Sequence, residues 1–143
     1  MTEQLQRVTA HLVVRGAIDA IEFYKKAFGA TENLRMPTED GKRLMHADVT
    51  INGMRIFLVD DFSDLPDCPG GDRILSPQKL KGTSVMLHLE VENCDAAVKR
   101  AADAGAEVLM PPWDAFWGAR YGQVIDPFGH AWSFAHMLPG KPA

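Results

Sequence analysis

Residues 17–30 read AIDAIEFYKKAFGA, and residues 94–106 read CDAAVKRAADAGA. In each stretch apolar residues recur every three or four positions and a glycine follows, which predicts an amphipathic helix that ends at that glycine. Gly29-Ala30 can be overlaid on Gly105-Ala106, at a separation of 76 residues. A repeat of this length indicates an internal duplication.

The segments around the two predicted helices follow the same order in both halves of the chain. Alternating or β-branched apolar runs predict four strands in each half: 8–14, 32–36, 44–51 and 54–59, then 84–91, 107–110, 120–125 and 131–136. Asn52-Gly53 predicts a tight hairpin turn, and Pro111-Pro112 is expected to end the strand before it. We therefore predict an α+β fold of two tandem βαβββ modules, with module 1 at about 7–60 and module 2 at about 83–137. Residues 61–82, rich in proline, glycine and aspartate, form the predicted linker.

The composition is typical of a globular protein and excludes several classes of partner. The chain has 143 residues, which fits a single domain over 1–143, and a formal net charge of −4. It contains no run of basic residues, so neither nucleic acid nor an anionic membrane surface is an expected partner. The polar N-terminus lacks a signal-peptide core, and no apolar run is long enough to span a bilayer. We expect a cytoplasmic protein with two reduced cysteines.

Four blocks of sequence together resemble one protein superfamily. They are residues 20–30, 91–106, Trp117-Gly118-Ala119-Arg120-Tyr121-Gly122 and Asp126-Pro127-Phe128-Gly129-His130-Ala131-Trp132. In this combination the chain resembles the glyoxalase/bleomycin-resistance/extradiol dioxygenase (vicinal oxygen chelate) superfamily, and within it the phosphonate-operon B-protein-like branch. The resemblance implies a cup-shaped mixed β-sheet, and it commonly implies a homodimer. In metal-using members four inward His, Gln or Glu side chains hold a divalent ion, whereas other members bind a drug without metal.

The four positions that the resemblance assigns to metal ligands carry unsuitable side chains. They fall on Thr9 and Phe57 in the first half and on Met86 and Ser133 in the second. Phenylalanine cannot coordinate a metal, a thioether is a soft ligand, and hydroxyls are weak neutral ones. We therefore predict no metal and no other cofactor.

Two histidines stand at equivalent places in the two halves. His11 follows Thr9 by two residues and His88 follows Met86 by two, so strand alternation places both rings on the inner side of the cup. They are interpreted as histidines that bond to neighbours or contact a ligand. Alternatively, the pair acts as acid and base together with Glu90, the nearest inward carboxylate.

The segment 113–122 offers aromatic faces and one cation. Trp117 and Tyr121 suit a flat ligand and Arg120 an anion; alternatively, Trp117 packs the loop and Arg120 pairs with a surface aspartate. Cys94 stands beside a predicted helix start, which can lower the pKa of a thiol. The expected ligand-binding residues are Thr9, His11, Phe57, Met86, His88, Trp117, Arg120, Tyr121 and Ser133.

Three functions remain open at this point. The first is a metal-free homodimer that binds a small organic molecule in the cup. The second is an enzyme of lyase, isomerase or transferase type that uses His11, His88 and Glu90, with or without a divalent metal. The third is a structural or regulatory partner without a pocket. The resemblance establishes a fold and leaves function to the chemistry of the site.

Overall fold

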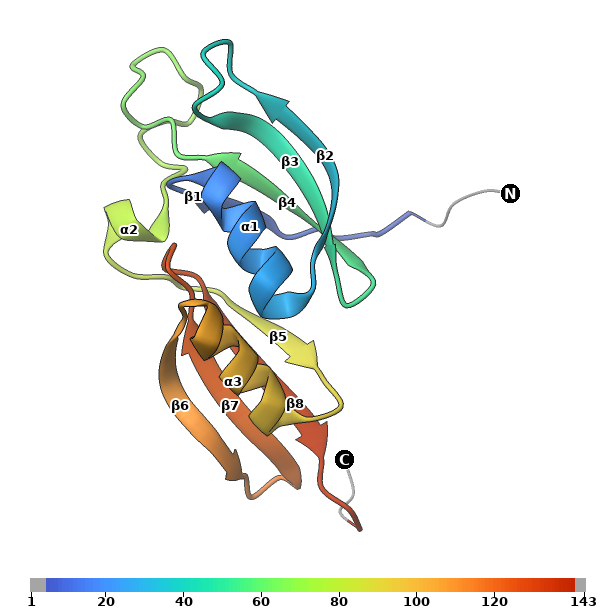
Figure 1. Cartoon of the computed structure of the whole chain (residues 1–143). Helices are drawn as coiled ribbons and strands as arrows, with labels where there is room; N and C mark the ends of the chain where they lie inside the picture. Colours follow the sequence, from blue (N-terminus) through green and yellow to red (C-terminus); the bar gives the residue numbers. More distant parts are fainter. Residues whose placement is uncertain (1–4, 141–143) are drawn as a thin grey trace.

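The computed structural model describes residues 5–140, and within them two four-stranded sheets each carry one long helix (Figure 1). Module 1 contains β1 (His11–Val14), α1 (Ala17–Phe28), β2 (Thr31–Pro37), β3 (Leu44–Ile51) and β4 (Met54–Asp60). Module 2 contains β5 (Met86–Glu90), α3 (Cys94–Ala104), β6 (Glu107–Asp114), β7 (Ala119–Ile125) and β8 (Ala131–Met137). The short α2 (Pro77–Leu80) lies in the linker between them.

The two sheets have the same topology. Their strand orders are β1-β4-β3-β2 and β5-β8-β7-β6, and in each the first strand pairs in parallel with the last. The remaining neighbours are antiparallel. The matching order in both halves confirms the predicted α+β class with two βαβββ modules.

The predicted and observed elements differ by one or two residues at several strand ends, and more clearly at three places. β1 begins at His11, where its register with β4 starts, and of the residues before it the Ala10 carbonyl accepts from the Phe57 N–H at 2.9 Å. The linker contains α2, whose start is capped by the Ser76 side chain. β6 continues through Pro111-Pro112 to Asp114, with a register shift around the prolines. β6 is an edge strand, where a proline without a donor N–H costs little, so the expectation that the prolines end the strand was wrong.

Aromatic packing joins the two modules into one core. Trp132 and Phe134 on β8 are buried, and their rings contact Phe28 of α1 at centroid distances of 4.5 and 5.9 Å. Tyr24 stacks on Phe28 and also contacts Trp132. The helix-covered sides of both sheets therefore meet in the centre, and Figure 1 shows α1 and α3 on the same side of the molecule.

One buried carboxylate organises this junction. Asp126, in the turn before β8, accepts hydrogen bonds from Tyr24 Oη (2.6 Å) and Trp132 Nε1 (2.9 Å). It also accepts from the backbone N–H groups of Phe128 and His130. Gly129 completes the turn at φ +91°, where a Cβ would lie 2.6 Å from Pro77 Cβ. The residues of the turn 126–130 therefore serve the fold, through the buried hydrogen bonds of Asp126 and the positive φ of Gly129.

Candidate functional site

Each sheet has one side covered by a helix and one side that is open. Leu12 and Val14 of β1 are buried toward α1, so alternation places His11 on the opposite side. In module 2, Leu89 is buried and His88 lies opposite. We call these uncovered sides the first open face, which carries His11, His46, Asp48 and Phe57, and the second open face, which carries His88, Ser133, Tyr121 and Gln123.

Two imidazoles and a phenyl ring cluster on the first open face. The centroid of His46 lies 4.8 Å from that of Phe57, and the His11 ring lies 5.7 Å from Phe57 and 5.8 Å from His46. Partial burial, and then the neighbouring His46, lower the pKa of His11 below its usual value. His11 is therefore held mainly neutral at physiological pH.

A closed ion pair lies on the same face. The Asp48 carboxylate, only 5% exposed, accepts hydrogen bonds from Arg55 at 2.6 and 3.0 Å and from Asn33 at 3.3 Å. Burial alone would raise the pKa of Asp48, but the bonds from Arg55 and Asn33 outweigh it and hold that pKa below its usual value. This carboxylate is already committed to partners of its own module.

Three side chains form a hydrogen-bonded chain on the second open face. Ser133 Oγ lies 2.7 Å from Nδ1 of His88, whose Nε2 lies 3.1 Å from a Glu90 carboxylate oxygen. An ionised carboxylate only accepts, so the proton of the neutral ring belongs on Nε2. Nδ1 is then the acceptor, and the Ser133 hydroxyl donates to it.

Aromatic side chains continue this face beyond His88. The Trp117 ring contacts Phe116, Tyr121 and Trp113 edge-on, at centroid distances of 5.0, 5.3 and 6.0 Å. Tyr121 stacks against His88 at 6.2 Å. Its hydroxyl receives a hydrogen from Gln123 and faces the sulfur of Met86 at 3.8 Å. Phe116 is 91% exposed, so this aromatic cluster faces solvent in the single chain.

Arg120 points to the opposite side of its sheet from Tyr121. Its guanidinium donates to Asp95 at 2.9 and 3.1 Å and to Asp114 at 3.0 Å. Asp95 belongs to α3, which covers the other side of the strands. Of the two interpretations of Arg120, pairing with surface aspartates is the observed one, and Arg120 is not on the second open face.

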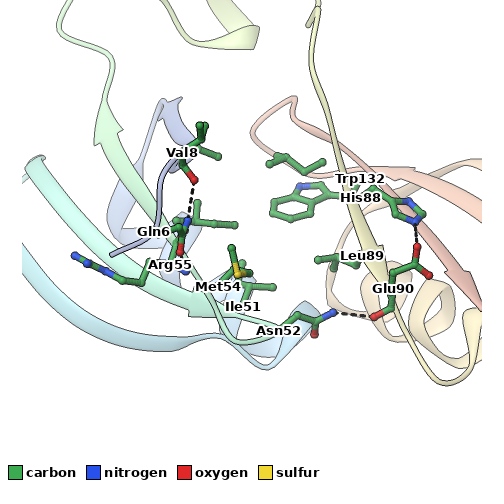
Figure 2. Close-up of a pocket in the computed structure, with 13 residues that line it drawn as sticks. Gln6, Val8, Ile51, Asn52, Met54, Arg55, His88, Leu89, Glu90 and Trp132 are labelled. Carbon is green, nitrogen blue, oxygen red and sulfur yellow. Dashed lines mark hydrogen bonds and ion pairs between the residues drawn. The ribbon is translucent and has the colours of Figure 1, made fainter. Parts of the chain in front are cut away.

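One pocket lies between the modules, on the helix-covered side of β5. Its volume is about 480 Å³, and apolar side chains such as Ile51, Met54 and Leu89 line it. Figure 2 shows Leu89 and Trp132 pointing into this gap, with His88 and Glu90 directed away from it across β5. Asn52 crosses the gap and donates to the Glu90 backbone carbonyl at 3.0 Å.

The two histidines border different pockets. His11 lines a pocket of about 390 Å³ with Cys68 and Ile74, whereas His88 borders the pocket between the modules. Strand alternation gave the correct side for each ring. A cavity shared by both rings stays a prediction, because α1, Trp132 and Phe134 join the modules on the helix-covered side and both rings lie on the sides that no helix covers.

The structure thus divides the residues expected at the site. Met86, His88, Trp117, Tyr121 and Ser133 come together around the second open face, and His11 and Phe57 lie on the first. Thr9 is half-buried in the segment that precedes β1. The sequence reasoning missed Gln123, Trp113 and Phe116, although Gln123 shares the strand parity of Tyr121.

The side chains present do not suit a divalent metal. Phe57 has no donor atom, Ser133 is engaged by His88, and Met86 faces the Tyr121 hydroxyl. Within the described part of the chain, no three His, Cys, Asp or Glu residues are grouped so that they could hold an ion. A dication here would lack the carboxylates needed to offset its desolvation.

Cys94 behaves differently from the expectation based on its helix position. Burial, and then the charge of Asp95, raise the pKa of this thiol to about 11. The Cys94 thiol also contacts the Phe134 carbonyl at 3.4 Å. The proposal of a lowered pKa was wrong because desolvation outweighs the helix N-terminus.

Comparison with known proteins identifies the family. The model of the Glyoxalase/Bleomycin resistance protein/Dioxygenase superfamily matches residues 4–134. The chain belongs to this superfamily. An uncharacterized protein of Mycobacterium tuberculosis (strain ATCC 25618 / H37Rv) is 48% identical over 131 residues, which cover 92% of this chain and 74% of that protein.

Solved structures share the fold of this chain. An Arabidopsis thaliana gene product is 29% identical with a TM-score of 0.70, covering 93% of this chain and all of that one. TioX from Micromonospora sp. ML1 has a TM-score of 0.70 at 24% identity, over 94% of this chain and 100% of its own. A PhnB protein from Bacillus cereus is 19% identical with a TM-score of 0.62, and the match covers 93% of this chain and 99% of that one. The last two, at low identity, support the shared fold and nothing further.

Among residues 5–140, no helix of this superfamily member is long and apolar enough to cross a membrane.

Proposed function

We propose that this superfamily member binds a small organic molecule on its second open face without a metal ion. The observation that carries the proposal is the aromatic cluster around Trp117 and Tyr121, which borders the polar pair His88 and Ser133. Large ring faces beside a few fixed polar groups are what a site for a flat organic ligand requires. The first open face instead carries the Asp48–Arg55 ion pair, whose charges already neutralise each other.

A second copy of the chain completes the proposed site. Both open faces leave large apolar side chains in contact with solvent: Leu34 and Met36 on the first, and Met86, Trp113 and Phe116 on the second. Apolar area of this kind marks an interaction surface. Placing the first open face of one copy over the second open face of another brings His11 of one chain near His88 of the other.

The proposed homodimer has a direct measurement. Light scattering at tens of micromolar should give twice the chain mass of 15.8 kDa. Mixing two variants, His11→Ala and His88→Ala, should yield heterodimers in which one of the two composite sites retains both histidines. A monomer at this concentration contradicts the composite site.

The ligand proposal is tested with a metabolite and drug library in a thermal-shift assay. A ligand at about 100 times its dissociation constant adds about 2.7 kcal/mol to the free energy of unfolding. Trp117→Ala and Tyr121→Ala should abolish the shift, whereas the control Leu80→Ala, on exposed α2, should keep it. Shifts that survive in both aromatic variants contradict this location.

A further inference from the structure

Beyond binding, the second open face contains an arrangement suited to covalent catalysis. His88 and Ser133 are direct neighbours on the parallel strands β5 and β8, and Glu90 follows two residues later on the same side. Their contacts, 2.7 Å from Ser133 Oγ to Nδ1 and 3.1 Å from Nε2 to Glu90, form an unbroken chain. A hydroxyl, an imidazole and a carboxylate in this order are the parts of a nucleophile, a base and a group that orients the base.

We propose that Ser133 is a nucleophile for acyl transfer, with His88 as its base and Glu90 as the positioning residue. The Glu90 carboxylate fixes the proton on Nε2, so that Nδ1 can take the hydroxyl proton of Ser133. Here the Glu90 carboxylate accepts from His88 Nε2, and the Ser133 hydroxyl donates to Nδ1. A histidine can act as a base through whichever ring nitrogen carries no proton. With Glu90 holding the proton on Nε2, that nitrogen is Nδ1, which faces Ser133.

Gln123 supplies a donor for the oxyanion. It lies directly opposite Ser133 on the neighbouring strand β7. One hydrogen of its amide is donated to Tyr121 Oη at 3.0 Å, and the second has no partner among residues 5–140. A preformed N–H donor next to the nucleophile stabilises the negative charge that develops on a carbonyl oxygen.

The reaction balances with an ester and water alone. Ser133 Oγ bonds to the ester carbonyl carbon while its proton passes to His88 Nδ1. The carbon–oxygen bond to the alcohol then breaks, and the alcohol leaves with the proton from His88. Water, deprotonated by His88, hydrolyses the acyl-serine and releases the acid. Because the Tyr121 ring stacks against His88, the base that holds Ser133, the substrate class is a small ester with a flat aromatic alcohol.

The experiment uses the full chain with 4-nitrophenyl acetate as the probe. Intact-mass spectra should show one acetyl group per chain, and peptide mapping should place it on Ser133. Ser133→Ala should remove this label, and His88→Ala should slow labelling by about a hundredfold or more. Glu90→Gln should also slow it, because the amide can donate to Nε2 and so favours the wrong tautomer. Ser84→Ala, in an exposed loop, is the matched control and should label like the original chain.

Circular dichroism should show that the Ser133 variant is folded, and Ser133→Cys gives a second readout. Its thiol should react with iodoacetamide faster than that of the same variant carrying His88→Ala. Acetyl groups only on lysines, or unchanged labelling in Ser133→Ala, overturn the proposal. A chain that gains thermal stability from library compounds but never acylates Ser133 also overturns the activity, and it leaves the binding proposal standing.

Discussion

The two open faces share a backbone plan and differ in their chemistry. In each module an inward histidine on the first strand pairs in register with a residue of the last strand, Phe57 beside His11 and Ser133 beside His88. On the first face, the charges of Asp48 and Arg55 pair with each other. On the second face, His88 is hydrogen-bonded to both Ser133 and Glu90. The two modules therefore share the positions of their strands and differ in their side chains, and this difference is why we propose the second face as the ligand site.

The turns that lead into the last strands provide the largest expected difference. Asp126→Ala in module 2 should lower the free energy of unfolding by about 3–5 kcal/mol, because it leaves the buried donors of Tyr24 and Trp132 without an acceptor. Asn52→Ala in the module 1 hairpin removes an exposed bond and places alanine at φ +51°, so it should cost less, about 1–2 kcal/mol. Urea unfolding measures both, and equal losses would contradict the special role of the module 2 turn.

The two cysteines should differ strongly in reactivity. A pKa of about 11 leaves the Cys94 thiol about a hundredfold less ionised than an ordinary protein thiol of pKa 9.0. With iodoacetamide at pH 8, Cys68 in the linker should therefore be alkylated first, and Cys94 should react only after unfolding. Peptide mapping over time reports both rates. Rapid alkylation of Cys94 in the folded protein would show that the helix start activates it.

Removing a polar group from each open face should affect stability unequally. Asp48→Ala breaks bonds from Arg55 and Asn33 and should cost about 1–3 kcal/mol. Ser133→Ala removes one bond to a histidine that is 41% exposed, and should cost about 1 kcal/mol. Thermal unfolding of the two variants gives the comparison. A larger loss from Ser133→Ala would indicate that the hydroxyl is chiefly structural.

The smallest predicted effect is a pH dependence that comes from His11 on the first open face. The pKa of His11 is lowered in the folded chain, so its contribution to stability is present above the unfolded value near 6.5 and is lost as the pH falls through the folded value. His11→Gln should flatten the decline in stability below about pH 6.5. Urea midpoints between pH 7.5 and 5 would show this. An unchanged slope would assign the decline to other groups.

Local patterns in the sequence predicted the elements well, because each depends on residues close in the chain. The helices at 17–28 and 94–104 follow from apolar spacing and a terminal glycine, and the Asn52-Gly53 turn from its own two residues. The arrangement of the modules could not be predicted in this way. It depends on contacts such as Tyr24 with Asp126, which are 102 residues apart and leave no periodic signal.

The candidate site was predictable only in part, for the same reason. Strand alternation gave the sides of His11 and His88 correctly, and it also separates Arg120 from Tyr121, which the residue types alone had grouped together. The contact of His88 with Ser133 requires the register of two parallel strands 45 residues apart. Sequence reasoning named both residues without that register and so missed their hydrogen bond.

Metal-free binding is tested most directly by elemental analysis of tag-free protein before and after mild dialysis. The poor donors at Thr9, Phe57, Met86 and Ser133 predict that no zinc, nickel, iron or manganese approaches one equivalent per chain. Thermal shifts from library compounds should then be the same with and without a chelator. One equivalent of metal that survives dialysis, and that is lost in a His11→Ala, His88→Ala double variant, would contradict this account of the second open face.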